Sequence, residues 1–159
     1  MGSLGIRAAT VLDAERLAAV HVRSWQETYR GLLPDEIIDG KEQRMQDHYA
    51  TALAEPGATS FWLASWDGEI VALVAASALG PGHERLLELT SLYVLEEYQS
   101  RGIEEKLLNH AIGTAPCLVW VVEGASKTMS FYESQGFALD GETMTDEELG
   151  GAKLLRMVR

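Results

Sequence analysis

The chain has 159 residues, which suits one domain spanning 1–159 and is too short for two of ordinary size. Apolar residues make up 47% and charged residues 23%, the balance of a soluble globular protein. Acidic residues outnumber basic ones by 24 to 13, and the formal charge of −11 argues against nucleic acid and membrane surfaces as partners, because lysine and arginine supply most contacts to phosphates.

The first third of the sequence predicts one strand and two helical segments. A strand is expected over 6–10, followed by a helix over about 14–30 that Asp13 caps. Apolar residues recur at helical spacing through this helix, so one of its faces is largely apolar. A second helical segment is expected over about 34–53.

The middle of the chain predicts three strands. Strands over 61–66 and 69–79 are joined by Asp67-Gly68, a strong hairpin signal because both turn positions favour positive φ. The second of these strands is apolar on both faces, which is typical of a central strand. A third strand is expected over 86–95.

The last third alternates helices and strands. An amphipathic helix over 103–112 precedes a buried strand over 117–122, and a helix over 126–135 precedes two strands, near 138–144 and 153–158, that form a closing hairpin. The element order predicts an α/β (α+β) fold, in which about four helices pack against a mixed sheet of about seven strands.

Cysteine and histidine usage excludes two kinds of site. A single cysteine, Cys117, cannot form an internal disulfide, and its apolar surroundings favour packing over nucleophilic chemistry. The four histidines share no metal-ligand spacing, so no metal is expected. Because no signal peptide or bilayer-spanning apolar stretch is found, we expect a cytoplasmic location.

The segment from Glu88 to Leu108 carries the clearest chemical signal. A strand is followed by a turn containing Gln99, Arg101 and Gly102, and then by a helix. The free amides and partial positive charge at a helix start suit a pyrophosphate. The alternative is an ordinary strand-turn-helix unit that binds nothing.

Three segments resemble the GNAT superfamily of acyl-CoA-dependent N-acyltransferases. The signature Gln/Arg-x-x-Gly-x-Gly/Ala corresponds to Gln99-Ser100-Arg101-Gly102-Ile103-Glu104. A second motif, Asn-x-x-Ala-x-x-Phe-Tyr-Glu-x-x-Gly-Phe, corresponds to residues 125–137, and residues 23–34 resemble one bacterial branch of the superfamily. The resemblance covers nearly the whole chain in the right element order, and it implies a mostly antiparallel sheet.

The resemblance implies acetyl-CoA as the acyl donor. Backbone amides over 101–105 would hold the pyrophosphate, and the backbone over 92–94 would pair with the pantetheine arm like an added strand. The cofactor-binding residues implied in this way are Leu92, Tyr93, Val94, Gln99, Ser100, Arg101, Gly102, Ile103, Glu104, Glu105 and Ala125.

The resemblance also implies two catalytic residues. Glu88 matches the general base of some members, and Tyr132 matches the tyrosine that protonates the leaving thiolate. The chemistry needs both types, because an ammonium must lose a proton before attack and coenzyme A leaves best as a thiol. The alternatives are a solvated strand position for Glu88 and simple packing for Tyr132.

Three residues of the first helical region, Trp25, Tyr29 and Leu33, fall where such folds line the acceptor side, with ordinary core packing as the alternative. The sequence departs from the family pattern at Glu104, normally Gly or Ala, and at Ala125, normally Asn. A carboxylate at the start of the helix competes with the pyrophosphate for the same positive end.

The predicted function is direct transfer of an acetyl group from acetyl-CoA to a primary amine of a small molecule or peptide. The alternative is a non-catalytic GNAT-like module that binds acyl-CoA or a protein partner. The net acidity is compatible with a cationic acceptor, although acidity often reflects solubility alone. A homodimer is one arrangement that the resemblance allows, because dimers are common in the superfamily.

Overall fold

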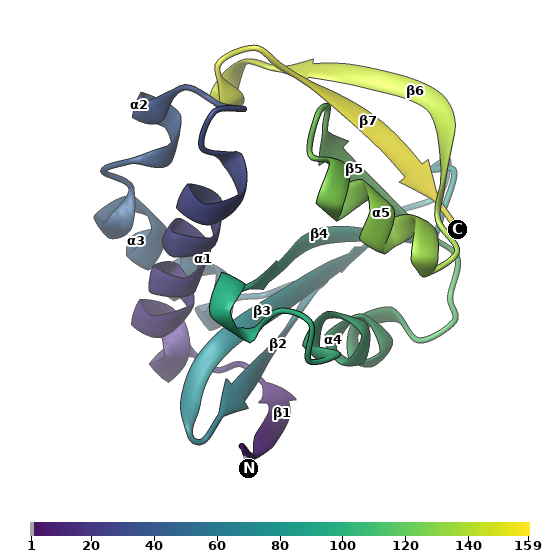
Figure 1. Cartoon of the computed structure of the whole chain (residues 1–159). Coiled ribbons are helices and arrows are strands. Elements are labelled where there is room, and N and C mark those ends of the chain that lie inside the picture. Colours follow the sequence, from purple (N-terminus) through teal and green to yellow (C-terminus); the bar gives the residue numbers. More distant parts are fainter. Residues whose placement is uncertain (1) are drawn as a thin grey trace.

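A computed structural model describes residues 2–159, which form a seven-stranded sheet flanked by helices (Figure 1). The strand order is β1-β2-β3-β4-β5-β7-β6, and every neighbouring pair is antiparallel except β4 and β5. The strands are β1 (Leu4–Ala8), β2 (Thr59–Trp66), β3 (Glu69–Ala78), β4 (Leu87–Val94), β5 (Cys117–Val122), β6 (Ala138–Asp146) and β7 (Ala152–Val158). The α-helices are α1 (Ala14–Tyr29), α2 (Asp35–Ile38), α3 (Glu42–Ala54), α4 (Ile103–Ile112) and α5 (Ser126–Ser134).

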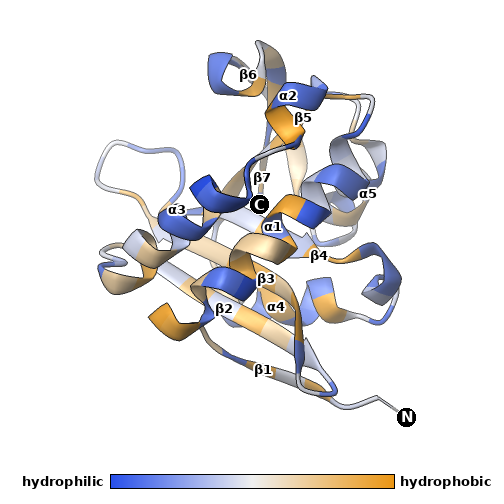
Figure 2. Ribbon diagram, turned by 90° about the vertical axis from the view of Figure 1, so that its left-hand side faces the viewer, coloured by the Kyte–Doolittle hydropathy of each residue, from blue (hydrophilic) through white to orange (hydrophobic). Residues whose placement is uncertain are grey.

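The core lies on both faces of the central strands. Helices α1 and α3 cover one side of β2–β4, and α4 covers the other (Figures 1 and 2). Residues 71–76 of β3 are all buried, which confirms the prediction of a central strand that is apolar on both faces. Leu17 of α1 and Leu107 of α4 are fully buried, so each helix contributes its apolar face to the core.

The structure corrects the predicted helix over 34–53. The segment is divided into α2 and α3 by Asp39 and Gly40, and Gly40 has a left-handed φ of 71°. The carboxylate of Asp39 accepts hydrogen bonds of 2.8 and 2.9 Å from Arg30, which hold Asp39 in an extended conformation at the end of α2. Periodicity alone could not show this tertiary contact.

The predicted start of the chain also needs correction. The first strand is β1 rather than 6–10, because Thr10 leaves the sheet and caps a 3-10 turn over Val11–Asp13. Asp13 stands at the N-cap of α1, but its side chain accepts no bond from an amide of that helix. Its carboxylate instead accepts hydrogen bonds of 2.8 Å from the two terminal nitrogens of Arg7 and from the amide of Thr10.

Several local predictions are confirmed. Asp67 and Gly68 both have positive φ, at 51° and 86°, in the turn between β2 and β3. The ranges of α4 and β5 match the predicted 103–112 and 117–122. These segments combine a clear hydrophobic period with an unambiguous turn, so the local signal agrees with the tertiary structure.

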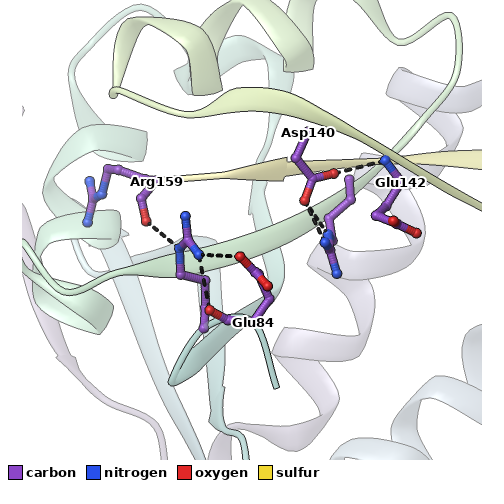
Figure 3. Close-up of polar contacts among 6 residues, drawn as sticks. Glu84, Asp140, Glu142 and Arg159 are labelled. Atoms are coloured by element: carbon purple, nitrogen blue, oxygen red, sulfur yellow. Dashed lines mark hydrogen bonds and ion pairs between the residues drawn. The ribbon is translucent and has the colours of Figure 1, made fainter. Parts of the chain in front are cut away.

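The C-terminal hairpin is held by polar contacts at its centre and at the chain end (Figure 3). The register of β6 against β7 shifts between Leu139 and Thr143, and in this irregular segment Asp140 accepts from Arg156 Nε at 2.7 Å and from the Glu142 amide at 2.9 Å. The carbonyl of Arg159 accepts a 3.1 Å bond from Arg85 Nε. The Asp140–Arg156 contact ties β6 to β7, and the Arg85 contact joins the residue after β7 to the loop that leads into β4.

Candidate active site

Strands β4 and β5 are paired at one end only. Their parallel pairing covers Leu87–Leu89 and Cys117–Val119 and stops there. The next residue of β4, Thr90, is the extra residue of a bulge, because Ala75 of β3 pairs with Ser91 and Ala76 pairs with Leu89. The rest of β4 has backbone groups on the β5 side that no strand pairs.

A cavity of about 520 Å³ lies at this divergence, between the ends of α1, α4 and α5. Its volume is in the range of small-molecule sites. The part of β4 from Leu89 to Val94 lines one side, and 119–121 of β5 and the start of α5 line another. Unpaired strand backbone facing a cavity can bind an extended ligand through main-chain hydrogen bonds.

The predicted cofactor-binding residues divide into two groups. The cavity wall includes Leu92, Tyr93, Val94, Gln99, Ser100, Glu104 and Ala125. The wall does not include Arg101, Gly102, Ile103 or Glu105. The structure therefore brings together the β4 backbone, the β4–α4 loop and the start of α5, while part of the helix start faces elsewhere.

The β4–α4 loop has an unusual backbone. Ser100 and Gly102 both have left-handed φ, at 66° and 78°, and Ser100 is one of two non-glycine residues with positive φ in residues 2–159. This conformation is rare for residues with a Cβ atom and is more common where a loop shapes a binding site. It turns the chain so that the free amides of the first turn of α4 follow directly after Gly102.

Arg101 contributes its side chain to a different contact. Its guanidinium lies 4.6 Å from the ring centroid of Trp66 and 5.1 Å from that of Tyr98. It also donates a 3.3 Å hydrogen bond to the carbonyl of Glu97. Arg101 therefore anchors the loop to β2 and does not place its charge on the cavity wall.

Tyr132, the predicted acid, is on the cavity wall. It belongs to α5, is 5% exposed, and its ring lies edge-on to those of Phe131 and Phe137. Burial raises the pKa of Tyr132 above its ordinary value, so the hydroxyl keeps its proton at neutral pH. Within residues 2–159 no side chain or backbone group is hydrogen-bonded to this hydroxyl, which leaves its proton available to a ligand.

Glu88, the predicted base, is not on the cavity wall. It lies in the paired part of β4, opposite Ser77 of β3 and Leu118 of β5. Burial raises the pKa of this half-buried carboxyl, and His83 partly offsets the effect. The structure thus places Glu88 where β4 and β5 are still paired, outside the cavity wall. A proton from the cavity could reach it only through water.

The predicted acceptor residues are not all brought together. Tyr29 lines the cavity, whereas Trp25 and Leu33 do not. Trp25 lies between His21 and Tyr29, with ring centroids 5.3 and 5.2 Å away, and Leu33 belongs to a small apolar cluster with Ile38 of α2. Core packing, the alternative that the sequence left open, describes both positions.

Sequence reasoning missed a polar stripe on α1. Ser24, Glu27 and Thr28 line the cavity and follow the i, i+3, i+4 spacing that puts residues on one helix face. Ser24 is 2% exposed, and its hydroxyl has no hydrogen-bond partner within the described chain. The sequence did contain a signal for this stripe, because polar residues interrupt the apolar pattern of the helix there.

Glu27 connects the two sides of the cavity. One of its carboxylate oxygens accepts a 2.9 Å hydrogen bond from the amide of Glu96, just after β4, and the other accepts a 3.3 Å bond from Arg23. Arg23 also reaches Glu97 at 2.9 Å. These contacts fix the end of α1 against the segment that leads into the β4–α4 loop.

Neither a membrane-spanning helix nor a metal-binding cluster is found in the part of the chain that the structure describes. None of the helices in residues 2–159 combines the length and apolar character needed to cross a membrane. The same residues contain no group of three or more His, Cys, Asp or Glu side chains placed to hold a metal ion.

Comparisons with known proteins agree with this geometry. The sequence model of the Acetyltransferase (GNAT) family matches residues 21–137. The chain is 30% identical over 160 residues to the probable N-acetyltransferase Rv2775 of Mycobacterium tuberculosis, covering 96% of this chain and 90% of that protein.

Solved structures show the same fold. The PaiA N-acetyltransferase of Thermoplasma acidophilum, crystallised with coenzyme A, has a TM-score of 0.76 and 24% identity, covering 97% of this chain and 98% of that one. An acetyltransferase of Thermus thermophilus has a TM-score of 0.69 and 22% identity, covering 99% and 96%. The chain therefore belongs to the GNAT acetyltransferase family.

Proposed function

We propose that this protein transfers an acetyl group from acetyl-CoA directly to a primary amine of a small molecule or peptide. The observation that carries the proposal is the meeting, in one cavity, of the unpaired β4 backbone, the β4–α4 loop and the Tyr132 hydroxyl. Strand backbone suits the amide groups of pantetheine, and the helix start suits a pyrophosphate. The residues present therefore fit the donor.

Tyr132 is proposed as the general acid. When the amine nitrogen bonds to the thioester carbon and the carbon–sulfur bond then breaks, the sulfur leaves with the bonding electron pair. The Tyr132 hydroxyl donates its proton to that sulfur, so coenzyme A departs as a neutral thiol. A tyrosine hydroxyl is protonated at neutral pH, as a general acid requires, and burial raises the pKa of Tyr132 further.

The amine must lose two protons over the reaction, one to become nucleophilic and one after attack. We propose Glu88 as the base, acting through water because it does not line the cavity. Its raised pKa brings it closer to neutral pH, where a base is most effective. Glu27, the carboxylate on the α1 side of the wall, already accepts hydrogen bonds at both oxygens.

The α1 side is proposed as the acceptor side. Ser24 and Thr28 line the cavity, and the Thr28 hydroxyl can accept a hydrogen bond from an amine. Tyr29 adds an aromatic surface there. The acidic balance of the chain favours a cationic acceptor.

A non-catalytic acyl-CoA-binding or interaction module is the second candidate. Glu104 and Ala125 favour it, because both lie on the cavity wall where the family pattern has a small residue and an asparagine. Tyr132 is retained, which favours the enzyme.

Coenzyme A binding followed by an acceptor screen separates the candidates. At a concentration of about 100 times Kd, coenzyme A should stabilise the protein by about 2.7 kcal/mol, visible as a higher melting temperature. An enzyme also releases free thiol from acetyl-CoA when a suitable amine is added. A binding module shows the thermal shift without thiol release, and an unrelated function shows neither.

A further inference from the structure

Lys127, in the first turn of α5, is the only lysine or arginine among the described residues that line the cavity. The wall also carries three carboxylates, those of Glu27, Glu96 and Glu104. Arg101, the basic residue of the β4–α4 loop, is engaged with Trp66 and Tyr98 outside the wall. An anion that enters this acidic cavity therefore finds one side-chain cation.

Lys127 is held at the β4–α4 loop by a short chain of hydrogen bonds. Its ammonium nitrogen donates to Gln99 Oε1 at 2.7 Å, and Gln99 Nε2 donates to the carbonyl of Val94 at 3.0 Å. We call this chain the Lys127–Gln99 clasp. It joins the end of β4, the β4–α4 loop and the start of α5, three parts of the wall that are distant in sequence.

The partner of Lys127 is neutral, and this matters for anion binding. No salt bridge within residues 2–159 involves Lys127, so its positive charge is not neutralised by a carboxylate. A hydrogen bond to an amide oxygen is weaker than one to a charged oxygen. A phosphate oxygen can therefore replace Gln99 as the acceptor of the ammonium proton at a net gain.

Lys127 also lies in the part of the wall that contains Glu104. Glu104, in the first turn of α4, and Gln99 and Ser100, in the loop before it, line the cavity together with Lys127. The Glu104 carboxylate weakens the attraction of this helix start for an anion. A nearby ammonium group of opposite charge compensates for that loss.

We propose that the Lys127 ammonium group gives up its hydrogen bond to Gln99 and binds the pyrophosphate of acetyl-CoA instead. Its positive charge thereby compensates for the negative charge of Glu104. This inference rests on the proposed function, because it assigns a residue to the donor half of that site. It makes Lys127 a donor-binding residue, with no part in proton transfer.

Titration of coenzyme A into variants tests the proposal without relying on activity. Lys127→Met removes the charge but keeps a chain of similar length, and Lys127→Arg keeps the charge. Lys41→Met, at a lysine that does not line the cavity, is the matched control. Isothermal titration gives Kd for coenzyme A, and ligand-observed NMR gives Kd for pantetheine, which lacks phosphate.

Lys127→Met should weaken coenzyme A binding about tenfold or more, as expected for a lost charge-assisted contact, and change pantetheine binding less than about twofold. Lys127→Arg and Lys41→Met should stay near wild type. If Lys127→Met binds coenzyme A as tightly as wild type does, the proposal is overturned. An equal loss of affinity for pantetheine would also overturn it, because it would indicate a structural role for Lys127. Failure of the wild type to bind coenzyme A would instead refute the proposed function, and the inference with it.

Discussion

Tyr132 illustrates how one buried hydroxyl can be suited to acid chemistry. It is on the cavity wall, its pKa is raised by burial, and its proton is not committed to another group of the described chain. A phenol is already protonated at neutral pH, so burial does not create the acid, and the raised pKa makes this hydroxyl a weaker proton donor than a tyrosine in water. The case for Tyr132 as the acid therefore rests on its position on the cavity wall and not on its pKa.

Tyr132→Phe should lower kcat by about 10² or more, because the variant cannot protonate the leaving sulfur. Kd for coenzyme A should change little, since the ring still packs against Phe131 and Phe137. Steady-state kinetics with isothermal titration measures both values. Tyr98→Phe, at a tyrosine outside the cavity wall, is the control, and an unchanged kcat for Tyr132→Phe would remove the residue from the mechanism.

Glu88→Gln should reduce the rate most near neutral pH, where the amine is mainly protonated and needs a base. The loss should shrink at high pH, because more free amine is already present. The pH profile of kcat/KM checks this, with Glu84→Gln, an exposed residue outside the cavity wall, as the control. A loss that does not vary with pH would point to a binding or structural role.

At the residue scale, a motif in the sequence points to Tyr132, whereas the position of Glu88 depends on the register of its strand. The motif containing Tyr132 identified a residue that lies on the cavity wall. Glu88 precedes a bulge at Thr90, and an inserted residue changes which face of a strand the later side chains occupy. The bulge depends on pairing with β3, so the position of Glu88 relative to the cavity could not be read from the sequence.

Among the elements, α1 carries an ion pair at its start and part of the cavity wall near its end. At its start, Asp13 pairs with Arg7, and this hydrogen-bonded guanidinium, with smaller contributions from Thr10, lowers the pKa of Asp13 to about 2. Toward its end, Ser24, Glu27 and Thr28 face the cavity. A stable start of α1 therefore helps to fix this part of the cavity wall, the proposed acceptor side.

Asp13→Asn should lower the free energy of unfolding by about 1–2 kcal/mol at pH 7, a value discounted because Arg7 is half exposed. A carboxyl whose folded pKa is depressed stabilises the fold above its unfolded pKa of about 3.9. That contribution disappears as the pH falls toward the folded value of about 2. Urea unfolding at several pH values should therefore show the difference from wild type shrinking below about pH 4; a constant difference would contradict the account.

Helix α4 presents two acids at its start, of which Glu104 lines the cavity and Glu105 does not. At a separation of about 6 Å, each repulsive charge pair with a phosphate costs about 0.7 kcal/mol in water and more in a less polar site. Glu104→Ala removes the charge and keeps helix propensity. It should tighten coenzyme A binding by about tenfold, measured by isothermal titration.

Glu105→Ala is the matched control for that change, since it removes the same charge from the next position of the same helix. Its effect on Kd should be clearly smaller than that of Glu104→Ala. If Glu104→Ala left Kd within about twofold of wild type at low salt, the carboxylate would not act on the phosphates, and the repulsion argument would fail.

At the level of elements, the sequence predicted what local signals control. The turn at Asp67-Gly68 and the range of α4 were correct because turn chemistry and periodicity agree there. The division between α2 and α3 was missed because it depends on Arg30 holding Asp39. Long-range contacts of this kind leave no periodic trace in the sequence.

For the whole molecule, the order of elements predicted the sheet but not the cavity. A seven-stranded mixed sheet follows from alternating strands and helices, and the structure confirms it. The divergence of β4 and β5 after Leu89 and Val119 is a property of the assembled sheet. That divergence brings α1, the β4–α4 loop and α5 to one cavity, so the site belongs to the fold as a whole.

The most direct test of the account is acetyl transfer itself. Acetyl-CoA is incubated with a panel of small cationic, neutral and acidic amines, and both free thiol and acetylated amine are quantified. Thiol release should depend on the amine, with one acetylated amine formed per thiol, and should be fastest with a cationic amine. If the protein binds coenzyme A but none of the amines raises thiol release above the rate measured without an amine, acetyl transfer to amines is contradicted.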